Sequence, residues 1–219
     1  MAQKRRHRSD ERTAGRALPK SVDPVGVRII GGQFRGRKLQ YAGDLRVRPM
    51  KDRTREAVFN LVGPAVRGKH AIDLFAGTGV LALEALSRGA SRATLVEQHF
   101  PTAAVVRRNV AVLGAENRCQ VISGSVFAWW KRRSDTGIEP WLVFCSPPYA
   151  FFVDRGEQML EMLKQMLAAA PANSVFVVES DERFDFSELP DPEGWDVREY
   201  PPARVGVYFK SYAGAPASS

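Results

Sequence analysis

A strand, a glycine turn and a helix follow one another without a break at residues 70–86, and this order limits the folds open to the chain. His70 to Phe75 is a short apolar run of the kind that forms a buried parallel strand. Gly77 and Gly79 predict a tight turn that lets a ligand approach the backbone. Val80 to Leu86 has apolar residues at helical spacing. The pattern predicts a ligand site at the helix N-terminus, although an ordinary strand–helix turn has the same signature.

Strand and helix signals alternate through the rest of the chain. The expected strands are 93–97, 119–123, 141–145 and 174–179; the expected helices are 101–113, 125–133 and 154–170; and 195–200 with 205–212 are expected to form a closing hairpin. Alternating units of this kind predict an α/β fold with a doubly wound, mostly parallel sheet.

An appendage is expected ahead of this alternation. Apolar residues interleave with Arg and Lys between residues 27 and 39, and Gly31-Gly32 and Gly36 supply turns, which predicts an N-terminal β-hairpin. Residues 52–62 predict a helix with an apolar side toward the core and a basic side carrying Arg53 and Arg55.

The tetrapeptide Ser146-Pro-Pro-Tyr149 follows the strand at 141–145 and carries the most specific chemistry. Two prolines fix φ and donate no N–H, so the carbonyls around them are held outward. The Ser146 hydroxyl and the Pro147 carbonyl can accept hydrogen bonds from an exocyclic amino group, while the Tyr149 ring stacks on a base. An enzyme that methylates a base nitrogen needs this arrangement once the base has left its stack. Alone, the same tetrapeptide is usually only a turn.

A carboxylate ends the expected strand at 93–97, about twenty residues after the glycine turn. At this spacing Glu97 can hold both hydroxyls of a ribose. The alternative interpretation is a negative charge that favours the N-terminus of the helix beginning near Pro101.

Taken together, these motifs resemble class I S-adenosylmethionine-dependent methyltransferases. With Arg28–Leu39 and Arg48–Asn60 ahead of Asp73-Leu-Phe-Ala-Gly-Thr-Gly79, the chain resembles the RsmD family of 16S ribosomal RNA (guanine-N2)-methyltransferases over most of its length. The resemblance implies a Rossmann-like fold, S-adenosyl-L-methionine as the cofactor, and the exocyclic N2 of a guanine in small-subunit ribosomal RNA as the target.

The resemblance also implies which residues form the site. The Ser146 hydroxyl, Pro147 and Tyr149 would face the methyl group as the catalytic set. The methionine part of the cofactor would lie against Asp73 and the Ala76–Gly79 turn, and the ribose against Glu97. The full cofactor-binding set is Asp73, Phe75, Ala76, Gly77, Gly79, Glu97, Gln98, Ser125 and Val126.

Two residues depart from the family pattern, which has Asp or Asn at position 146 and an acid at position 125. Both positions are Ser in this chain. Because a neutral Ser takes a proton less readily than a carboxylate, we expect the proton of the methylated amine to pass to water. Ser-Pro-Pro-Tyr is also similar to the motif of cytosine-N4 methyltransferases, so the target atom is less firmly indicated than the fold.

Positive charge is concentrated at the start of the chain. Residues 1–55 hold 16 Lys and Arg against 5 Asp and Glu, a net charge of +11, whereas the remainder holds 16 against 19, a net charge of −3. This distribution indicates a nucleic-acid-binding arm on a nearly neutral catalytic body. The expected RNA-binding residues are Arg28, Arg35, Arg37, Lys38, Arg48 and Arg53.

Four regions are therefore expected. They are a basic disordered tail at 1–24, an RNA-binding hairpin and helix at 25–60, a class I methyltransferase catalytic domain at 61–212, and a frayed tail at 213–219. No secretory signal or membrane-length apolar run is present, so a cytoplasmic protein is expected.

Other chemistries find little support. His7, His70 and His99 lack metal-ligand spacing, so no metal is expected. Cys119 and Cys145 fall on expected buried strands and should be free thiols. Carbon methylation by a Cys145 nucleophile is an alternative, but the Pro-Cys pair typical of such enzymes is absent.

The expected partner is ribosomal RNA or a small-subunit particle, with no membrane and a monomeric state. Two rival functions stay open. One is a cytosine-N4 or adenine-N6 nucleic-acid methyltransferase, and the other is a non-catalytic RNA-binding ribosome assembly factor.

Overall fold

The computed structural model describes residues 26–41, 50–132 and 137–211. The tails predicted at 1–24 and 213–219, and the predicted RNA-binding residue Arg48, lie outside the described residues.

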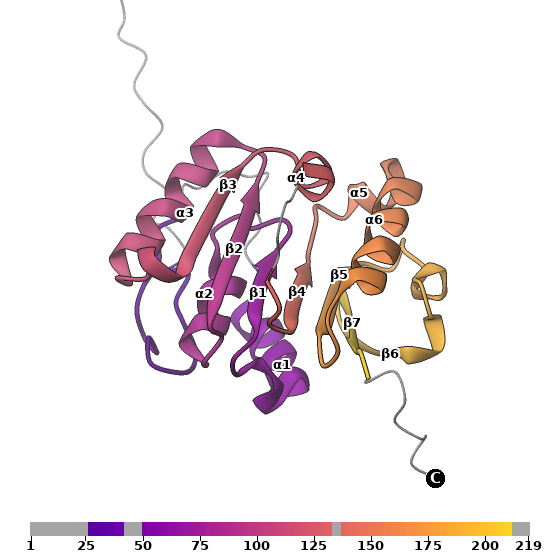
Figure 1. The fold of residues 1–219 in the computed structure, drawn as a ribbon, viewed down its shortest axis with the longest axis horizontal. Helices are drawn as coiled ribbons and strands as arrows, with labels where there is room; N and C mark the ends of the chain where they lie inside the picture. The colour runs from indigo at the N-terminus through magenta and orange to yellow at the C-terminus, as the bar shows by residue number, and fades with distance from the viewer. Residues whose placement is uncertain (1–25, 42–49, 133–136, 212–219) are drawn as a thin grey trace, which may run out of the picture.

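Seven strands form one sheet in the order β3-β2-β1-β4-β5-β7-β6 (Figure 1). The first five strands in this order run parallel, and β7 pairs antiparallel with both β5 and β6. The predicted doubly wound, mostly parallel sheet is therefore confirmed. The strands are β1 His70–Asp73, β2 Arg92–Glu97, β3 Cys119–Ser123, β4 Trp141–Cys145, β5 Val175–Ser180, β6 Trp195–Tyr200 and β7 Ala203–Phe209.

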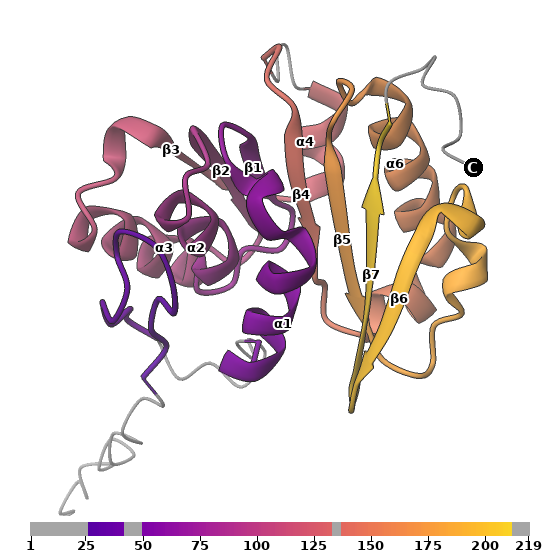
Figure 2. The ribbon, with the colours of Figure 1, turned by 90° about the horizontal axis from the view of Figure 1, so that it is seen from below.

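Helices cover both faces of the sheet, with α1, α2 and α3 on one face and α4, α5 and α6 on the other (Figures 1 and 2). Successive residues of a strand point to opposite faces, so Leu142 and Phe144 join one apolar core while Trp141, Val143 and Cys145 join the other. Burial on both faces explains why the strands read as continuous apolar runs. The α-helices are α1 Asp52–Val62, α2 Val80–Ser87, α3 Phe100–Val112, α4 Val126–Arg132, α5 Ala150–Asp154 and α6 Gly156–Ala169.

Short 3₁₀ turns occupy several connections between these elements. They are η1 Gly63–Val66, η2 Glu116–Arg118, η3 Phe186–Glu188 and η4 Pro192–Gly194.

The helix predicted at 154–170 is α6 in the structure, and a further short helix lies directly before it. The short helix α5 precedes α6, and Arg155 between them has φ −138° and ψ 28°, which is not helical. The sequence prediction missed α5 because Phe151, Phe152 and Val153 are aromatic or β-branched and favour strands.

Residues 26–41, here called the N-terminal segment, fold back on themselves as a hairpin-like loop. Antiparallel pairing is limited to one bridge between Arg28 and Lys38, flanked by a hydrogen bond from the Leu39 N–H to the Val27 carbonyl at 2.7 Å. Regular strands of a hairpin do not form in this segment. Its apolar residues Val27, Ile29 and Leu39 are instead buried in the core on the α1–α3 face.

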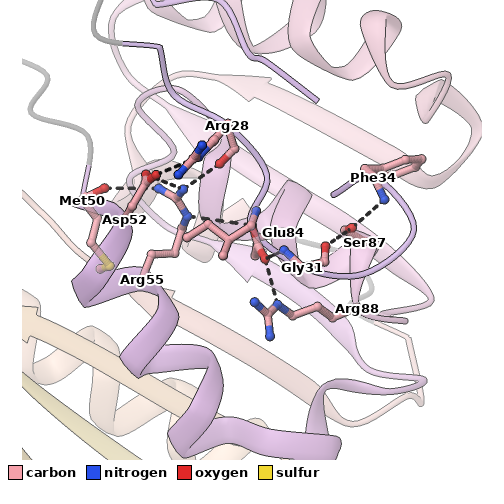
Figure 3. A network of polar contacts seen from close by, with 10 residues as sticks. Arg28, Gly31, Phe34, Met50, Asp52, Arg55, Glu84, Ser87 and Arg88 are labelled. Atoms are coloured by element: carbon pink, nitrogen blue, oxygen red, sulfur yellow. Dashed lines mark hydrogen bonds and ion pairs between the residues drawn. The ribbon is translucent and has the colours of Figure 1, made fainter. Parts of the chain in front are cut away.

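Polar side chains of α2 hold the N-terminal segment in place (Figure 3). The Glu84 carboxylate accepts hydrogen bonds from the Ile30 and Gly31 N–H groups, both at 2.7 Å. The Ser87 hydroxyl accepts one from the Phe34 N–H at 2.9 Å. Gly32 is required at its position, because a Cβ there would lie 1.9 Å from the Ser87 carbonyl oxygen at φ +75°.

Arg55 is not on an exposed basic side of α1, and that prediction is wrong. Its side chain is fully buried, whereas the side chain of Arg53 is exposed. The guanidinium donates to the Arg28 carbonyl at 2.6 Å and to the Asp52 carboxylate at 2.9 Å, and its Nε lies 3.8 Å from the Glu84 carboxylate. Burial lowers the pKa of Arg55, while Asp52 and Glu84 act in the opposite direction. The residue joins α1 to the N-terminal segment (Figure 3).

Candidate active site

The order of the strands places the site at the carboxyl ends of β1 and β4. Chain order reverses between these two strands, since β1 is followed outward by β2 and β3 on one side and β4 by β5 on the other. In open α/β sheets a ligand crevice forms outside such a switch point. The Leu74 N–H donates to the Phe144 carbonyl at 3.0 Å, and the Phe75 and Phe151 rings pack edge to face at 5.5 Å. The predicted glycine turn and the Ser-Pro-Pro-Tyr motif therefore lie side by side.

The glycine turn after β1 has the geometry that the sequence predicts. Gly77 and Gly79 have φ of 53° and 79°, values that favour glycine. A Cβ on Gly79 would lie 3.0 Å from Leu95 and 3.2 Å from Val106. Gly79 is the N-cap of α2, so the glycine turn lies directly at the N-terminus of that helix.

Glu97, at the end of β2, ties this turn to the next loop. One carboxylate oxygen accepts the Gly77 N–H at 2.9 Å, and the other accepts the His99 N–H at 2.7 Å. Because His99 is the N-cap of α3, the carboxylate does lie at the N-terminus of that helix, and it holds the glycine turn as well. Each oxygen can accept a further hydrogen bond, which leaves capacity for two ribose hydroxyls. Gln98 beside it is exposed.

Asp73, the last residue of β1, is a buried acid. Its side chain is 1% exposed, and neither oxygen has a regular hydrogen-bond partner among the described residues. Its pKa is raised to about 7, mainly by burial and also by the Glu97 charge, while the nearby Phe75 and Ala82 N–H groups oppose the rise. A cationic group in the crevice would stabilise the ionised form. The residue thus suits a positively charged ligand.

The loop after β3 closes the same edge of the sheet. The Gly124 N–H donates to the Glu97 carbonyl at 2.9 Å, which brings Ser125 beside the end of β2. Ser125 is half-buried, and Val126 begins α4 and is buried. The structure therefore gathers the predicted cofactor-binding residues from three consecutive strand ends. Phe75, Ala76 and Gly77 come from the first, Glu97 and Gln98 from the second, and Ser125 and Val126 from the third.

The Ser-Pro-Pro-Tyr motif leads directly from β4 into α5. Ser146 and Tyr149 are half-buried, and Pro147 is buried. The Pro148 carbonyl accepts the Phe151 N–H at 2.8 Å and so begins the turn into α5. One of the two prolyl carbonyls is thus used locally, in the turn between β4 and α5.

Glu179, at the end of β5, joins this motif, and the sequence analysis gave it no role. Its carboxylate accepts hydrogen bonds from the Ser146 hydroxyl and from the Tyr149 hydroxyl, the latter at 3.3 Å. The side chain is buried, and burial raises its pKa, while the hydrogen bonds from Ser146 and Tyr149 act in the opposite direction. In the sequence, Glu179 is marked only by its place in a polar Glu-Ser pair at the end of an apolar strand. The pairing of β4 with β5 is needed to show which residue Glu179 faces.

The predicted RNA-binding residues Arg28, Arg35, Arg37 and Lys38 are all exposed on the N-terminal segment, and Arg53 is exposed on α1. Helix α3 adds basic residues that the sequence analysis missed. Arg108 donates to the Gln40 side chain at 3.0 Å, and Arg37 donates to the Val112 carbonyl at 2.5 Å. The guanidinium of Arg118 lies 5.9 Å from the centre of the Phe34 ring. The basic surface therefore extends from the N-terminal segment onto α3 and the turn that follows it.

Metal and thiol chemistry gain no support from the described part of the chain. No group of three or more His, Cys, Asp or Glu side chains is arranged there to hold a metal ion. Cys119 and Cys145 are free thiols, and burial raises the pKa of Cys119 to about 12 and that of Cys145 further. A thiol that stays protonated is a poor nucleophile, which weighs against carbon methylation by Cys145. Over the same residues, the longest and most apolar helices fall short of a membrane span.

The chain matches a known protein family and several curated relatives. The model of the family described as "Conserved hypothetical protein 95" matches residues 27–200. The chain is 39% identical over 123 residues to "Ribosomal RNA small subunit methyltransferase D" of Escherichia coli, an alignment that spans 56% of this chain and 60% of that relative. A protein of the same name from Haemophilus influenzae is 33% identical over 172 residues, which cover 77% of this chain and 84% of that relative.

A solved structure has the same fold. The yhhF protein of Escherichia coli superposes with a TM-score of 0.69 and 28% sequence identity, and the match covers 85% of this chain and 98% of that one.

Proposed function

The chain belongs to the family described as Conserved hypothetical protein 95, and we propose that it transfers a methyl group from S-adenosyl-L-methionine to the exocyclic N2 of a guanine in small-subunit ribosomal RNA. One observation carries the proposal. A glycine turn, which two carboxylates border, lies next to the Ser-Pro-Pro-Tyr motif at the carboxyl ends of β1 and β4. The first suits a charged nucleoside ligand, and the second suits an amino-bearing base.

The residues around the glycine turn fit the cofactor. S-adenosyl-L-methionine, when bound, supplies a methyl group already activated on a positively charged sulfur. Asp73 is a buried acid without a regular partner in the described residues, so it would gain from a cation nearby. Glu97 retains hydrogen-bonding capacity for the ribose, and the Gly77 and Gly79 backbone allows close approach. Phe75, Ala76, Gln98, Ser125 and Val126 complete the proposed site.

The residues of the Ser-Pro-Pro-Tyr motif would hold the acceptor base. Stacking of a flipped base on Tyr149 is typically worth about 1–3 kcal/mol. The Ser146 hydroxyl and the Pro147 carbonyl would accept hydrogen bonds from the amino group and aim its lone pair at the methyl group. Because the methyl group arrives activated, catalysis consists mainly of this positioning and of proton removal.

The basic surface fits an RNA partner. Arg28, Arg35, Arg37 and Lys38 stand on a segment that is fixed to α2 through Glu84 and Ser87, so their charges are presented from a supported loop. Each phosphate contact releases counterions, which gives affinity without sequence specificity. The names of the Escherichia coli and Haemophilus influenzae relatives support ribosomal RNA as the partner.

One rival function retains an observation in its favour. With Ser at position 146, the Ser-Pro-Pro-Tyr motif is similar to that of cytosine-N4 methyltransferases. A cytosine or adenine amino group is therefore the alternative target. The non-catalytic alternative rested on the absence of acids at positions 125 and 146. It is weakened because Glu179 brings a carboxylate to Ser146.

Mass mapping of ribosomal RNA modifications tests the proposal. Small-subunit RNA from cells that lack the gene should have lost one N2-methylguanosine, and plasmid-borne wild-type protein should restore it. Loss of an N4-methylcytidine or N6-methyladenosine instead would establish the rival target. An unchanged modification map in cells with an assembly defect would favour the non-catalytic alternative.

A further inference from the structure

We propose that Glu179 receives the proton released in the methyl transfer, with Ser146 as the relay between the base amino group and the carboxylate. The inference rests on the proposed function, because it assumes that an amino group occupies the space before Ser146. It replaces the expectation that the proton passes directly to water.

The sheet itself sets the position of Glu179. Strands β4 and β5 are parallel neighbours, and Cys145 is paired with Val178. The two residues that follow this pair in the chain therefore lie beside each other. Those residues are Ser146 and Glu179, and the Ser146 hydroxyl donates to one Glu179 oxygen. The other oxygen accepts the Tyr149 hydroxyl at 3.3 Å. Two groups of the acceptor motif therefore converge on one buried carboxylate.

This carboxylate decides the direction of the Ser146 hydrogen bond. An ionised carboxylate only accepts, so the single hydroxyl proton of Ser146 is committed to Glu179. The lone pairs of the Ser146 oxygen are then left for a donor on the other side. An amino group is such a donor, whereas a ring nitrogen acceptor is not. The same contact from its hydroxyl fixes the Tyr149 side chain that would stack the base.

Among the described residues, the charged groups near Glu179 pair with other partners and do not compensate its negative charge. On β7, Val205 is opposite Glu179, and the adjacent Arg204 is directed toward Glu199 and the Phe186 ring. On the chain after β5, Asp181 is paired with Arg183.

The neighbouring strand β4 and the next strand β1 bring no cationic side chain to Glu179 among the described residues. The buried Cys145 thiol on β4 stays protonated, and Asp73 belongs to β1, which β4 separates from β5. Within the described residues, Glu179 therefore has hydrogen-bond donors but no cationic partner. A positive charge that develops on the amine at transfer would be favoured by this acid.

The step balances in atoms and charge. The new bond joins the methyl carbon to the amine nitrogen, the bond between that carbon and the cofactor sulfur breaks, and the sulfur keeps the electron pair as a neutral thioether. The nitrogen then carries a positive charge and one proton too many. That proton moves to the Ser146 oxygen while the Ser146 hydroxyl proton moves to the Glu179 carboxylate. The products are a neutral methylamino base, a neutral Ser146 and a protonated Glu179, which afterwards loses its proton to water.

Burial supports this role because it raises the pKa of Glu179 above that of an ordinary glutamate. A general base works best when its pKa approaches the working pH. Turnover should therefore fall as pH drops through the ionisation of Glu179, since the protonated acid cannot take up the released proton. The Ser146 and Tyr149 hydrogen bonds oppose this rise in pKa, because they favour the ionised carboxylate.

The test compares Glu179→Gln with the matched control Glu182→Gln, which removes an exposed carboxylate three residues further on. Methyl transfer to small-subunit particles is measured from pH 5 to 9, and S-adenosyl-L-methionine affinity is measured by calorimetry. We expect Glu179→Gln to lower kcat by about 100-fold or more and to abolish the acid limb of its pH profile. Cofactor affinity should stay within about twofold of wild type. Glu179→Asp should keep the acid limb at a reduced rate, and the control should match wild type.

Coupling to Ser146 gives a second readout. Because both residues serve one relay, Ser146→Ala combined with Glu179→Gln should cost little more than either change alone.

Two results would overturn the inference while leaving the proposed function intact. One is wild-type kcat with an unchanged acid limb in Glu179→Gln. The other is a parallel loss of cofactor affinity and kcat with the acid limb retained, which would mean a merely structural role. A wild-type protein that methylates no nucleoside in any particle would instead refute the proposed function, and this inference with it.

Discussion

The contact between Glu84 and the N-terminal segment gives the sharpest stability prediction. Glu84→Gln keeps the shape of the side chain and removes its charge. The side chains of Glu84 and Arg55 are both fully buried, and the Arg55 Nε lies 3.8 Å from the Glu84 carboxylate. The carboxylate also accepts hydrogen bonds from two backbone N–H groups, both at 2.7 Å. Gln has one acceptor oxygen, so one N–H group loses its partner. Arg55 and Arg88, whose Nε lies 2.8 Å from the carboxylate, both lose a counter-charge.

The size of the effect follows from these contacts. Removing one partner of a buried ion pair typically costs about 3–5 kcal/mol, and Asp52 still bonds to Arg55 at 2.9 Å, so we expect about 3 kcal/mol. Such a loss is a large share of the roughly 5–15 kcal/mol that stabilises a typical domain.

Urea unfolding of Glu84→Gln measures this cost, with exposed Glu188→Gln as the control. Trypsin should also cleave the N-terminal segment at Arg35 and Arg37 sooner in Glu84→Gln than in wild type. The double variant Glu84→Gln/Arg55→Met should regain part of the stability, because it leaves no buried charge without its counter-charge. A loss below about 1 kcal/mol with unchanged trypsin cleavage would refute this reasoning.

Three further predictions concern the ligands. Glu97→Ala should weaken S-adenosyl-L-methionine binding by about 1–3 kcal/mol, because hydrogen bonds to a charged group are lost, and calorimetry with unchanged affinity would remove the ribose role. Asp73 has a pKa raised to about 7, and a cationic ligand favours its ionised form, so cofactor affinity should rise as pH increases toward 7 and level off above it. Asp73→Asn should lack this pH dependence in the same calorimetric titration. Filter binding across a salt series should show weaker RNA affinity and a shallower salt slope, with the cofactor site unaffected, when alanine replaces Arg28, Arg35, Arg37 and Lys38.

Local sequence signals were sufficient for most of the sheet. The predicted bounds of β3 and β4 agree with the structure because apolar runs between turn residues mark buried parallel strands. The glycine turn was predictable because Gly77 and Gly79 have backbone angles that other residues rarely adopt. These features depend on neighbours in the chain, which the sequence displays directly.

The features that the sequence missed depend on contacts between distant segments. Glu179 faces Ser146 only because β4 and β5 are adjacent in the sheet, 33 residues apart in the chain. Arg55 was predicted on the side of α1 away from the core because arginine is rarely buried. Its burial is stabilised by hydrogen bonds to Asp52 and the Arg28 carbonyl. The role of Arg108 likewise requires α3 to pack beside Gln40.

Transfer of an isotopically labelled methyl group tests the central claim most directly. Purified protein is incubated with S-adenosyl-L-methionine carrying a deuterated methyl group and with small-subunit particles from cells that lack the gene, and the RNA is digested for nucleoside mass spectrometry. We expect the label in N2-methylguanosine at a single site, and far less of it when Ser146→Ala or Tyr149→Ala replaces the wild-type protein. Label in a different nucleoside would contradict the assigned target, and label transferred equally by these two variants would contradict the assigned acceptor site.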